Sequence, residues 1–453
     1  MNKVIISLLL TLLLSLSSHA SEEFKWPEHL STPVFKAFIT AYNTNDFKEL
    51  SEFSKKYYPE KKAKNKALYW SQVFSEYGVL IPYKVADEKF HGLPAIWFQG
   101  VKTKNWLKMV IMTNEDGNKI KRAGVFRGMR PVGLLPPYQA MSIKEMPAYL
   151  SEYLTGLVND DLFSGSVLVA KGSDILFQQA YGYSDKSSKQ KNTVSTAFAL
   201  GSTTKNFTAV AIAQLVEQGK LKYSDTLSQH INEYPKDIAK QVTIHHLLTH
   251  TSGLEFDDYD PFYYESKEAK SIEQLLAIQL KYIDHMNRER RKDFQVLNKF
   301  DYTNDGYILL GAIIERVSGL SYSQYIEKNI FNLANMKQSI ADNNKLTTYK
   351  NKAIGYSHSN EDMRFELGGR KAVTGSAVID IIMPAGGTYA STGDLYKYFK
   401  ALNQGKLLSQ DTFSLMQKKH AVKGEMLTEQ NNIYYGYGLF LTEHGKAKSI
   451  GHN

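Results

Sequence analysis

The sequence predicts a protein of mixed secondary structure, of the α+β or α/β class, that is built from two domains. Its 453 residues exceed the length of one ordinary domain. Helix and strand patterns fill two stretches, residues 21–130 and 142–453, which a proline-rich segment separates. The hydrophobic fraction of 43% and the charged fraction of 22% are those of a folded globular protein.

Residues 1–20 are expected to be a secretory signal peptide. Lys3 precedes an apolar run, Val4–Leu14, that is shorter than the roughly 20 residues needed to cross a bilayer. Ser18 and Ala20 then place small residues where a cleavage site requires them. An uncleaved membrane anchor is the alternative. The rest of the sequence contains no further segment that we expect to cross a membrane.

The composition excludes several kinds of chemistry. Without cysteine there is no disulfide, no thiol nucleophile and no thiolate zinc site. The net charge of +9 comes from separated basic runs with interspersed acids, such as Arg288–Lys292, and no nucleic-acid motif accompanies them. We therefore expect no nucleic-acid partner. An exported protein without cysteine is common enough in bacteria and unusual among secreted animal domains, which favours the periplasm or the exterior of a bacterial cell.

Residues 21–130 predict a small α+β domain in which helices precede strands. Thr32-Pro33 caps the first of three expected helices, and Asn43–Asp46 ends it. The next two helices carry the apolar residues of 47–53 and 68–74.

After Gly78 the apolar period shortens towards two. Strands are expected at 95–99, 106–113 and 120–127, with Asp116-Gly117 as a hairpin turn. This order of elements resembles the NTF2-like family of cone-shaped α+β domains. The segment shows no catalytic constellation, so we expect a docking, dimerisation or substrate-presenting module.

Residues 131–141, with prolines at 131, 136 and 137, predict a linker. The second domain then begins with a capping box, Ser142–Glu145, that opens a helix. Two strands are expected next, at Gly165–Lys171 and Ile175–Tyr181. Helical patterns dominate the segment that follows Ser202.

A serine and a lysine three residues apart open an apolar helix. This spacing puts Ser202 and Lys205 on one helix face, with Cβ atoms about 5–6 Å apart. In the first helical turn, free backbone N–H groups and the helix dipole stabilise negative charge. A partly desolvated lysine can take the serine proton. The same spacing at Ser188 and Lys191 lies in a polar loop without an apolar helix and is interpreted as chance.

Tyr302 and Asn304 precede a second long apolar helix, which Gly319 ends. A tyrosine beside a cation can act as a general base, and an asparagine can bind a substrate amide. For Tyr302 by itself, a core tyrosine at a helix start is the alternative. Tyr349 and Asn351 repeat the pair in a polar stretch, where chance is the better interpretation.

Together these segments resemble the penicillin-recognising serine hydrolases of the class C β-lactamase and D-alanyl-D-alanine carboxypeptidase type, which include related esterases and D-amino-acid peptidases. The resemblance runs from about Phe163 to the end of the chain. It implies a β-lactamase-like fold, with an antiparallel sheet flanked by helices, a helical region, and the active site between them. The matching segments are 198–205, 243–254, 300–304, 306–311, 384–387 and 449–453.

The resemblance implies a role for each matching site residue. Ser202 matches the acylated nucleophile, Lys205 its activating partner and Tyr302 the general base. Asn304 matches the ligand of the substrate amide, and His452 the first residue of the third motif, which lines the cleft on a sheet edge. The family needs no metal or cofactor, because backbone N–H groups hold the oxyanion.

We therefore expect an exported, metal-independent serine hydrolase that forms an acyl-enzyme on Ser202. His452 stands where β-lactamases have a lysine, which favours a peptidase or esterase over a dedicated β-lactamase. The expected substrates are small molecules or short peptides: D-amino-acid peptides or amides, peptidoglycan fragments or small esters. The alternative is a non-catalytic envelope protein that uses a degenerate or truncated hydrolase fold for binding.

Two departures from the family pattern stand out. Leu297-Asn298 replaces the usual Pro-Gly before the Tyr302 segment, although Asn298 can still adopt a left-handed turn. The sequence also ends at Asn453, inside the third motif and before its usual glycine, the last strands and the closing helix. We therefore expect the 453-residue chain to be a C-terminally truncated form of a longer gene product, inactive or poorly soluble as written.

Other candidate sites are given structural interpretations. His245, His246 and His250 surround a helix end without carboxylates at ligand spacing, so a structural role is favoured over a metal site. The acidic residues of 257–260 are interpreted as solvated, since no EF-hand spacing surrounds them. Pro384–Gly387 is expected to form a tight turn packed under the active site.

Overall fold

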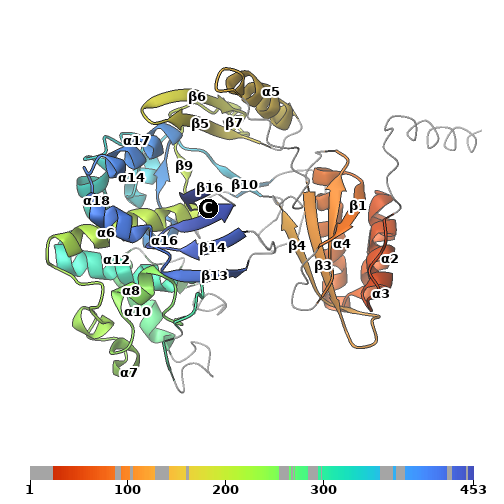
Figure 1. Cartoon of the computed structure of the whole chain (residues 1–453), viewed down its shortest axis with the longest axis horizontal. Helices are drawn as coiled ribbons and strands as arrows, with labels where there is room; N and C mark the ends of the chain where they lie inside the picture. The colour runs from red at the N-terminus through yellow and green to blue at the C-terminus, as the bar shows by residue number, and fades with distance from the viewer. Residues whose placement is uncertain are drawn as a thin grey trace, which may run out of the picture. The chain divides into compact units, whose positions relative to one another are not determined.

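The computed structural model forms two compact units (Figure 1). The boundary between the N-terminal and the C-terminal unit falls between residues 139 and 140. The signal peptide and the linker that the sequence predicts lie outside the residues that the structure describes. No helix among the described residues is long and apolar enough to cross a membrane. The structure describes residues 24–86, 93–102, 106–127, 142–159, 163–254, 265–266, 269, 271–283, 294–296, 298–357, 371–373, 383–425, 431–444 and 447–452.

The N-terminal unit consists of helices followed by a four-stranded antiparallel sheet in which each strand pairs with its neighbour in sequence. The helices cover one face of the sheet (Figure 1). The helices are α2 (Thr32–Asn43), α3 (Phe47–Tyr57) and α4 (Glu60–Tyr77). The strands are β1 (Leu80–Val85), β2 (Ala95–Gly100), β3 (Trp106–Thr113) and β4 (Ile120–Arg127).

The structure confirms the three predicted helices and the three predicted strands of this unit, but it also contains β1, which the sequence analysis missed. Pro82 stands in the middle of β1, and a proline within an apolar run argues against a strand. β1 is the edge strand, and its register with β2 shifts between Pro82 and Lys84. An edge strand tolerates the missing N–H group at such an irregularity.

Aromatic side chains fill the core between the helices and the sheet. The ring of Phe38 lies 4.4 Å from Trp70, 5.5 Å from Tyr42 and 5.6 Å from Phe53. Apolar residues of β2 and β3 close this core from the sheet side. The helical spacing of these aromatic residues in the sequence therefore marks the buried faces correctly.

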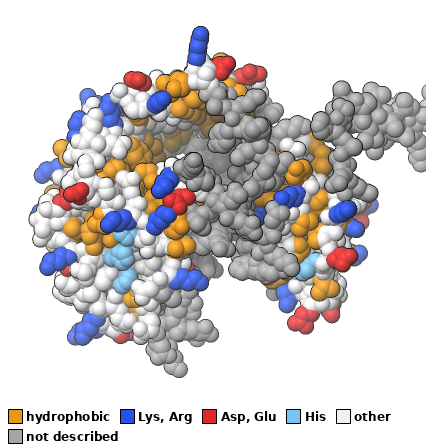
Figure 2. Space-filling model, viewed as in Figure 1, with side chains coloured by type: hydrophobic (Ala, Val, Ile, Leu, Met, Phe, Trp, Pro, Cys, Tyr) orange, Lys and Arg blue, Asp and Glu red, His pale blue; other side chains and the backbone are white. Residues whose placement is uncertain are grey.

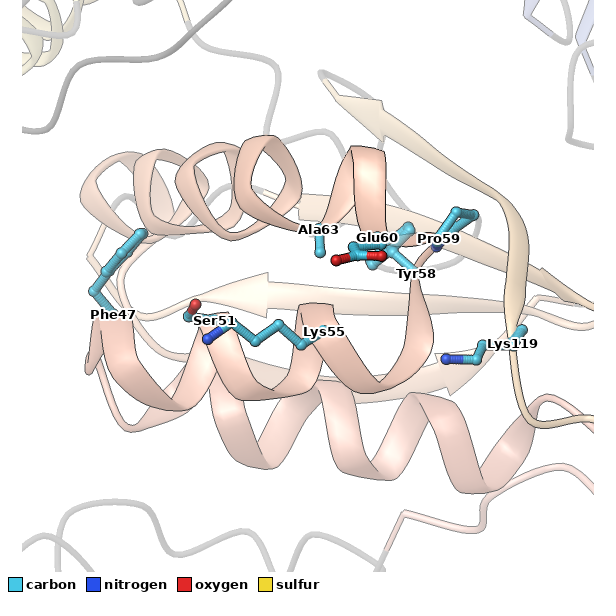
Figure 3. Close-up of a pocket in the computed structure, with 8 residues that line it drawn as sticks. All are labelled: Phe47, Ser51, Lys55, Tyr58, Pro59, Glu60, Ala63 and Lys119. Carbon is cyan, nitrogen blue, oxygen red and sulfur yellow. The ribbon is translucent and has the colours of Figure 1, made fainter.

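A groove of about 880 Å³ opens between α3 and α4 (Figure 3). Figure 3 shows Ser51 and Lys55 of α3 at the gap between the helices and Lys119 at one end of it. Tyr58 is buried, and its burial raises the pKa of its phenol to about 12. The groove thus combines charged side chains with two aromatic ones, those of Phe47 and Tyr58. Its lining residues are Phe47, Ser51, Lys55, Tyr58, Pro59, Glu60, Ala63 and Lys119.

The C-terminal unit combines a helical region with antiparallel β-structure. The helices are α5 (Met146–Asn159), α6 (Thr204–Glu217), α7 (Lys236–Ala239), α8 (Ile244–Leu248), α10 (Ile272–Lys281), α12 (Asp305–Ser318), α13 (Tyr322–Ile326), α14 (Asn343–Thr348), α16 (Met383–Gly386), α17 (Thr392–Asn403) and α18 (Gln410–Met416). Shorter helical turns are η1 (Gly201–Thr203), η2 (Leu227–Gln229) and η4 (Glu327–Phe331).

Its largest described sheet has the order β13-β14-β15-β16 and is antiparallel throughout. The remaining strands pair in twos: β5 with β6, β7 with β8, β9 with β12 and β10 with β11. The strands are β5 (Gly165–Lys171), β6 (Asp174–Tyr181), β7 (Tyr183–Asp185), β8 (Gln190–Lys191), β9 (Phe198–Ala199), β10 (Gly355–Ser357), β11 (Lys371–Val373), β12 (Tyr389–Ala390), β13 (Ala421–Glu425), β14 (Asn431–Tyr435), β15 (Phe440–His444) and β16 (Ala447–Gly451).

Two helices occupy the centre of this unit. Residues Thr204–Leu215 of α6 are buried without interruption, as are Asp305–Ile314 of α12, so neither helix has a solvated face over these turns. The ring of Phe207 packs edge-to-face against Phe331 and Tyr398, at 5.3 and 4.8 Å. The start of α6 is therefore held by buried aromatic contacts inside the unit.

The helix boundaries follow local signals that the sequence displays. The Ser142 hydroxyl accepts from Glu145 N, and Glu145 Oε2 accepts from Ser142 N, which confirms the capping box before α5. Gly319 ends α12 with φ of +70°, and Gly219 follows α6 with the same φ. Glycine adopts this left-handed conformation without steric cost.

A cluster of histidines joins α8 to the segment before β13. His245 Nδ1 lies 2.9 Å from the Tyr437 hydroxyl, and the His420 ring stacks on Tyr437 at 4.2 Å. Histidine side chains gather on the surface of the C-terminal unit in Figure 2. Burial, followed by His420 and His246, lowers the pKa of His245 to about 4. Burial also lowers the pKa of His420.

We expect the C-terminal unit to lose stability when the pH falls from about 6.5 towards 4. The unfolded chain binds a proton on His245 in this range and the folded chain does not, so acid favours unfolding by about 1–3 kcal/mol. Melting curves between pH 7 and pH 4 measure the decline, which should be smaller in His245→Gln. His230→Gln serves as a control outside the cluster, and an unchanged decline in His245→Gln would contradict the assignment.

Candidate active site

Ser202 lies in a one-turn 3-10 helix, η1, that leads directly into α6. The sequence analysis placed it in the first turn of the α-helix itself, so the structure shifts the helix start by one turn. Gly201 precedes it with φ of +51°, and Leu200 N donates to Thr388 O at 2.9 Å. Within the described residues the Ser202 N–H group donates no hydrogen bond. It is available to a negatively charged oxygen.

Lys205 is fully buried and lies against Ser202. Its Nζ donates to Ser202 Oγ at 3.2 Å, to Asn304 Oδ1 at 2.7 Å and to Ala385 O at 2.8 Å. A buried ammonium group is tolerated only when such acceptors replace water. The three-residue spacing therefore brings the serine and lysine together, as predicted, and more distant residues complete the lysine's surroundings.

The Tyr302 hydroxyl donates to Ser202 Oγ at 2.7 Å. The Lys205 ammonium lies 4.9 Å from the centre of the Tyr302 ring and 5.4 Å from that of Tyr307. A cation at this distance attracts the ring and stabilises negative charge on its oxygen. Ser202 Oγ thus has two hydrogen-bonding groups beside it through which its proton can move.

Asn304 occupies the position just before α12, next to Tyr302. Because its Oδ1 accepts from Lys205, its Nδ2 is directed elsewhere. Within the described residues Nδ2 donates to no protein group, so this amide can donate to a ligand carbonyl.

His452 lies directly after β16, and its ring centre is 6.3 Å from that of Tyr302. Its Nε2 lies 3.0 Å from the hydroxyl of Tyr435, whose pKa burial raises well above the ordinary value. The Tyr435 partner is therefore a neutral phenol. Thr203 Oγ1 donates to His452 O at 3.3 Å and joins the end of β16 to the serine turn.

The segment under the serine is a one-turn helix, α16, where the sequence analysis expected a tight turn. Thr208 Oγ1 donates to Pro384 O at 2.6 Å, and this holds α16 against α6. A Cβ atom on Gly311 would lie 2.3 Å from Pro384 Cγ, so only glycine fits at this point of α12. The close approach brings Ala385 O to Lys205.

The chance copies of the motifs take part in other contacts. Ser188 Oγ donates to Asp185 Oδ2 at 2.8 Å in the turn before β8. Asn351 Nδ2 donates to Ser195 O at 2.9 Å, in a contact that joins two loops. Their interpretation as chance is consistent with these structural roles.

The remaining sequence predictions concern Asn298, Leu297 and the acidic residues 257–260. Asn298 has φ of +49°, which confirms the left-handed turn, while Leu297 and the acidic residues 257–260 lie outside the described residues. The described residues hold no group of three His, Asp or Glu side chains that could bind a metal ion.

Sequence reasoning missed three groups at the site: the Ala385 carbonyl, the Tyr435 hydroxyl and the His250 imidazole. Ala385 and His250 fall inside segments that resemble the family, so the resemblance could have pointed to these two residues. A segment match does not say which atom points at the lysine or the tyrosine. Nothing in the sequence singles out Tyr435.

Comparisons with known proteins fit this geometry. The family model described as Beta-lactamase matches residues 150–453. The chain is 32% identical over 283 residues to Penicillin-binding protein 4* of Bacillus subtilis (strain 168), which covers 62% of this chain and 60% of that protein. The chain thus spans about three fifths of the length of this curated relative.

Two solved structures show the same fold. The penicillin binding protein from Bacillus halodurans has a TM-score of 0.52 and 30% identity, over 65% of this chain and 84% of that one. The D-amino acid amidase from Ochrobactrum anthropi SV3, complexed with D-phenylalanine, has a TM-score of 0.54 and 23% identity, over 68% and 83%. The β-lactamase-like fold predicted for the second domain is confirmed over residues 150–453.

Gly438, between β14 and β15, packs directly on the backbone of Lys205. Its φ is +70°, and its carbonyl accepts from Asn206 Nδ2 at 3.0 Å. A Cβ atom here would lie 2.8 Å from Lys205 O and 2.8 Å from Ala209 Cβ. The position of the lysine therefore depends on the absence of a side chain at residue 438.

We expect Gly438→Ala to destabilise the protein more than Gly319→Ala. Both glycines have φ of +70°, so alanine costs about 1 kcal/mol of backbone strain at either position. A Cβ on Gly319 meets no described atom within 4 Å, whereas on Gly438 overpacking adds about 1–3 kcal/mol. Thermal melting measures the difference, and equal melting temperatures would contradict the close packing described above.

Proposed function

The chain belongs to the beta-lactamase family, and from this premise we propose that it is an exported serine hydrolase that forms an acyl-enzyme on Ser202. The observation that carries the proposal is the pair of hydrogen bonds to Ser202 Oγ, from Tyr302 at 2.7 Å and from Lys205 at 3.2 Å. A nucleophile, a proton acceptor and a buried cation within hydrogen-bond distance are the elements of covalent acyl transfer.

In the acylation step Ser202 Oγ attacks the substrate carbonyl carbon and forms the new C–O bond. Ser202 Oγ gives its proton to the pair formed by Tyr302 and Lys205, and the two residues share it. The N–H group of Ser202 donates to the oxyanion that develops. The proton then passes to the leaving nitrogen or oxygen as its bond to the carbonyl carbon breaks.

In the deacylation step a water molecule attacks the acyl carbon. Tyr302 and Lys205 accept the proton of this water, and Ser202 Oγ takes it back when the ester bond breaks. The products are the free acid and the regenerated serine. Two chemically similar steps thus use the same two proton-carrying side chains.

We propose that the substrates are D-amino-acid peptides or amides, peptidoglycan fragments or small esters, and that the protein is a peptidase or esterase. The Nδ2 group of Asn304 supports binding of an amide carbonyl, since its Oδ1 is occupied by Lys205. His452 beside Tyr302 supplies an imidazole where a β-lactamase has lysine. The amidase of similar fold, solved with D-phenylalanine, is compatible with this class.

The second candidate function is a non-catalytic binding protein of the cell envelope. It would keep the hydrolase fold and use the N-terminal unit for docking. The buried, fully hydrogen-bonded Lys205 beside Ser202 favours catalysis over this candidate, because a pure binding site has no use for a costly buried cation.

We propose that the N-terminal unit is an NTF2-like docking or dimerisation module. Its order of helices followed by an antiparallel sheet supports this. Two apolar side chains, Ile81 on the edge strand β1 and Val101 directly after β2, are 53% and 41% exposed. Light scattering of the purified protein distinguishes a monomer from a dimer.

We expect a fluorophosphonate or penicillin probe to label the wild-type protein, expressed from its complete gene, covalently and Ser202→Ala not at all. Loss of the nucleophile should lower hydrolysis of a panel of esters and D-amino-acid amides by several orders of magnitude. Ser188→Ala, in the chance copy of the motif, is the matched control and should keep wild-type labelling. Labelling of Ser202→Ala would refute the assignment, and an unlabelled wild type would favour the binding protein.

Export is proposed from residues 1–20, whose charged start, apolar run and small residues are typical of a signal peptide. N-terminal sequencing of the protein from a bacterial host should give Ser21 as the first residue, with the protein in the periplasm or the medium. Recovery from the cytoplasm with Met1 still in place would contradict this proposal.

A further inference from the structure

We infer that His250 is a positioning residue for Tyr302, which it holds beside Ser202 by clamping the backbone on both sides of the tyrosine and by packing against its ring. The inference rests on the proposed function, in which Tyr302 moves the serine proton. It assigns a specific task to a histidine for which the sequence indicated only a structural role.

The backbone of His250 adopts an unusual conformation that serves this contact. His250 follows α8, is 1% exposed and has φ of +56°, which is uncommon for a residue other than glycine. This turn directs its carbonyl and its side chain at the same neighbouring segment. Such strain persists only where the surrounding contacts hold it.

Three hydrogen bonds connect this turn to the Tyr302 segment. Asp301 N donates to His250 O at 2.7 Å, and Thr303 N donates to His250 Nδ1 at 3.3 Å. Asn298 N donates to the next carbonyl, that of Thr251, at 3.2 Å. The residues immediately before and after Tyr302 are therefore both bound by His250.

The imidazole ring also packs against the phenol ring. The ring centres of His250 and Tyr302 are 4.2 Å apart, at an interplanar angle of 32°. Tyr307 lies 5.1 Å from the imidazole, and Tyr435 lies 4.7 Å from it. The imidazole is thus packed among aromatic rings that hold it in place, and it limits the movement of the Tyr302 ring on that side.

Histidine combines the two properties that this position uses. Its Nδ1 accepts a backbone hydrogen bond, so this nitrogen carries no proton, and its planar ring contacts an aromatic face. Asparagine offers an acceptor in the place of Nδ1 and tolerates positive φ, but it has no ring. Phenylalanine offers the ring but no acceptor. These two substitutions separate the two contributions.

The distance from Tyr302 to Ser202 Oγ is that of one short hydrogen bond, 2.7 Å. A displacement of about 1 Å at such a contact can lower a reaction rate by about 100-fold. We therefore expect His250→Asn and His250→Phe to slow acylation of Ser202 by about 10- to 100-fold. KM for an ester substrate should change by less than about threefold, since neither variant removes a group that we assign to substrate binding.

The decisive measurement is a double-mutant cycle with Tyr302→Phe. Rates of Ser202 labelling by a fluorophosphonate are compared for the wild type, His250→Asn, Tyr302→Phe and the double variant. If His250 acts through Tyr302, His250→Asn causes no further loss once the tyrosine hydroxyl is absent. His245→Asn, in the neighbouring helix, is the matched control and should label at the wild-type rate.

Each outcome decides the inference. Wild-type labelling rates in folded His250→Asn and His250→Phe would overturn it, as would losses that multiply in the double variant. Melting curves identify a variant that fails to fold. If either His250→Asn or His250→Phe does so, the labelling rate of the other variant is used for the test. A wild type that is not labelled would overturn the proposed function and this inference together. The first two outcomes, in which the wild type is labelled, would overturn the inference about His250 alone.

Discussion

The buried ammonium group of Lys205 is the constraint on which the rest of the site depends. A charge without water is several kcal/mol less favourable than a solvated one unless hydrogen-bond acceptors surround it. Its acceptors are Ser202 Oγ, Asn304 Oδ1 and Ala385 O, which come from three separate segments of the chain. The cation therefore holds these segments together. In doing so it also fixes the position of the nucleophile Ser202.

The packing around α6 follows from the same requirement. Because α6 begins beside the lysine and is buried on all sides, every neighbour must approach its backbone closely. Gly311 admits Pro384 of α16, and Gly438 lies on the carbonyl of Lys205. At these two positions glycine lets the backbones approach each other closely. Rigid packing of this kind keeps catalytic atoms within the small tolerances that acyl transfer requires.

A second level of support surrounds the groups that contact Ser202. His250 holds the segment of Tyr302 through its carbonyl and its ring nitrogen, and Tyr435 pairs with His452. These partners are buried, and burial keeps the Tyr435 phenol neutral by raising its pKa. The neutral phenol of Tyr435 adds no charge beside the ammonium of Lys205. The buried ammonium of Lys205 favours negative charge on the tyrosine and on the oxyanion.

The sequence by itself determined the features that depend on neighbouring residues. The spacing of Ser202 and Lys205, the capping box before α5 and the glycine at the end of α12 all follow from local backbone geometry, which residue identity sets directly. Only the tertiary structure decided which distant groups meet. The lysine's acceptors Asn304 and Ala385 stand 99 and 180 positions along the chain, and the pairing of β1 despite Pro82 depends on its place at the sheet edge. Such contacts arise from the packing of whole helices and strands, and no short stretch of sequence contains that information.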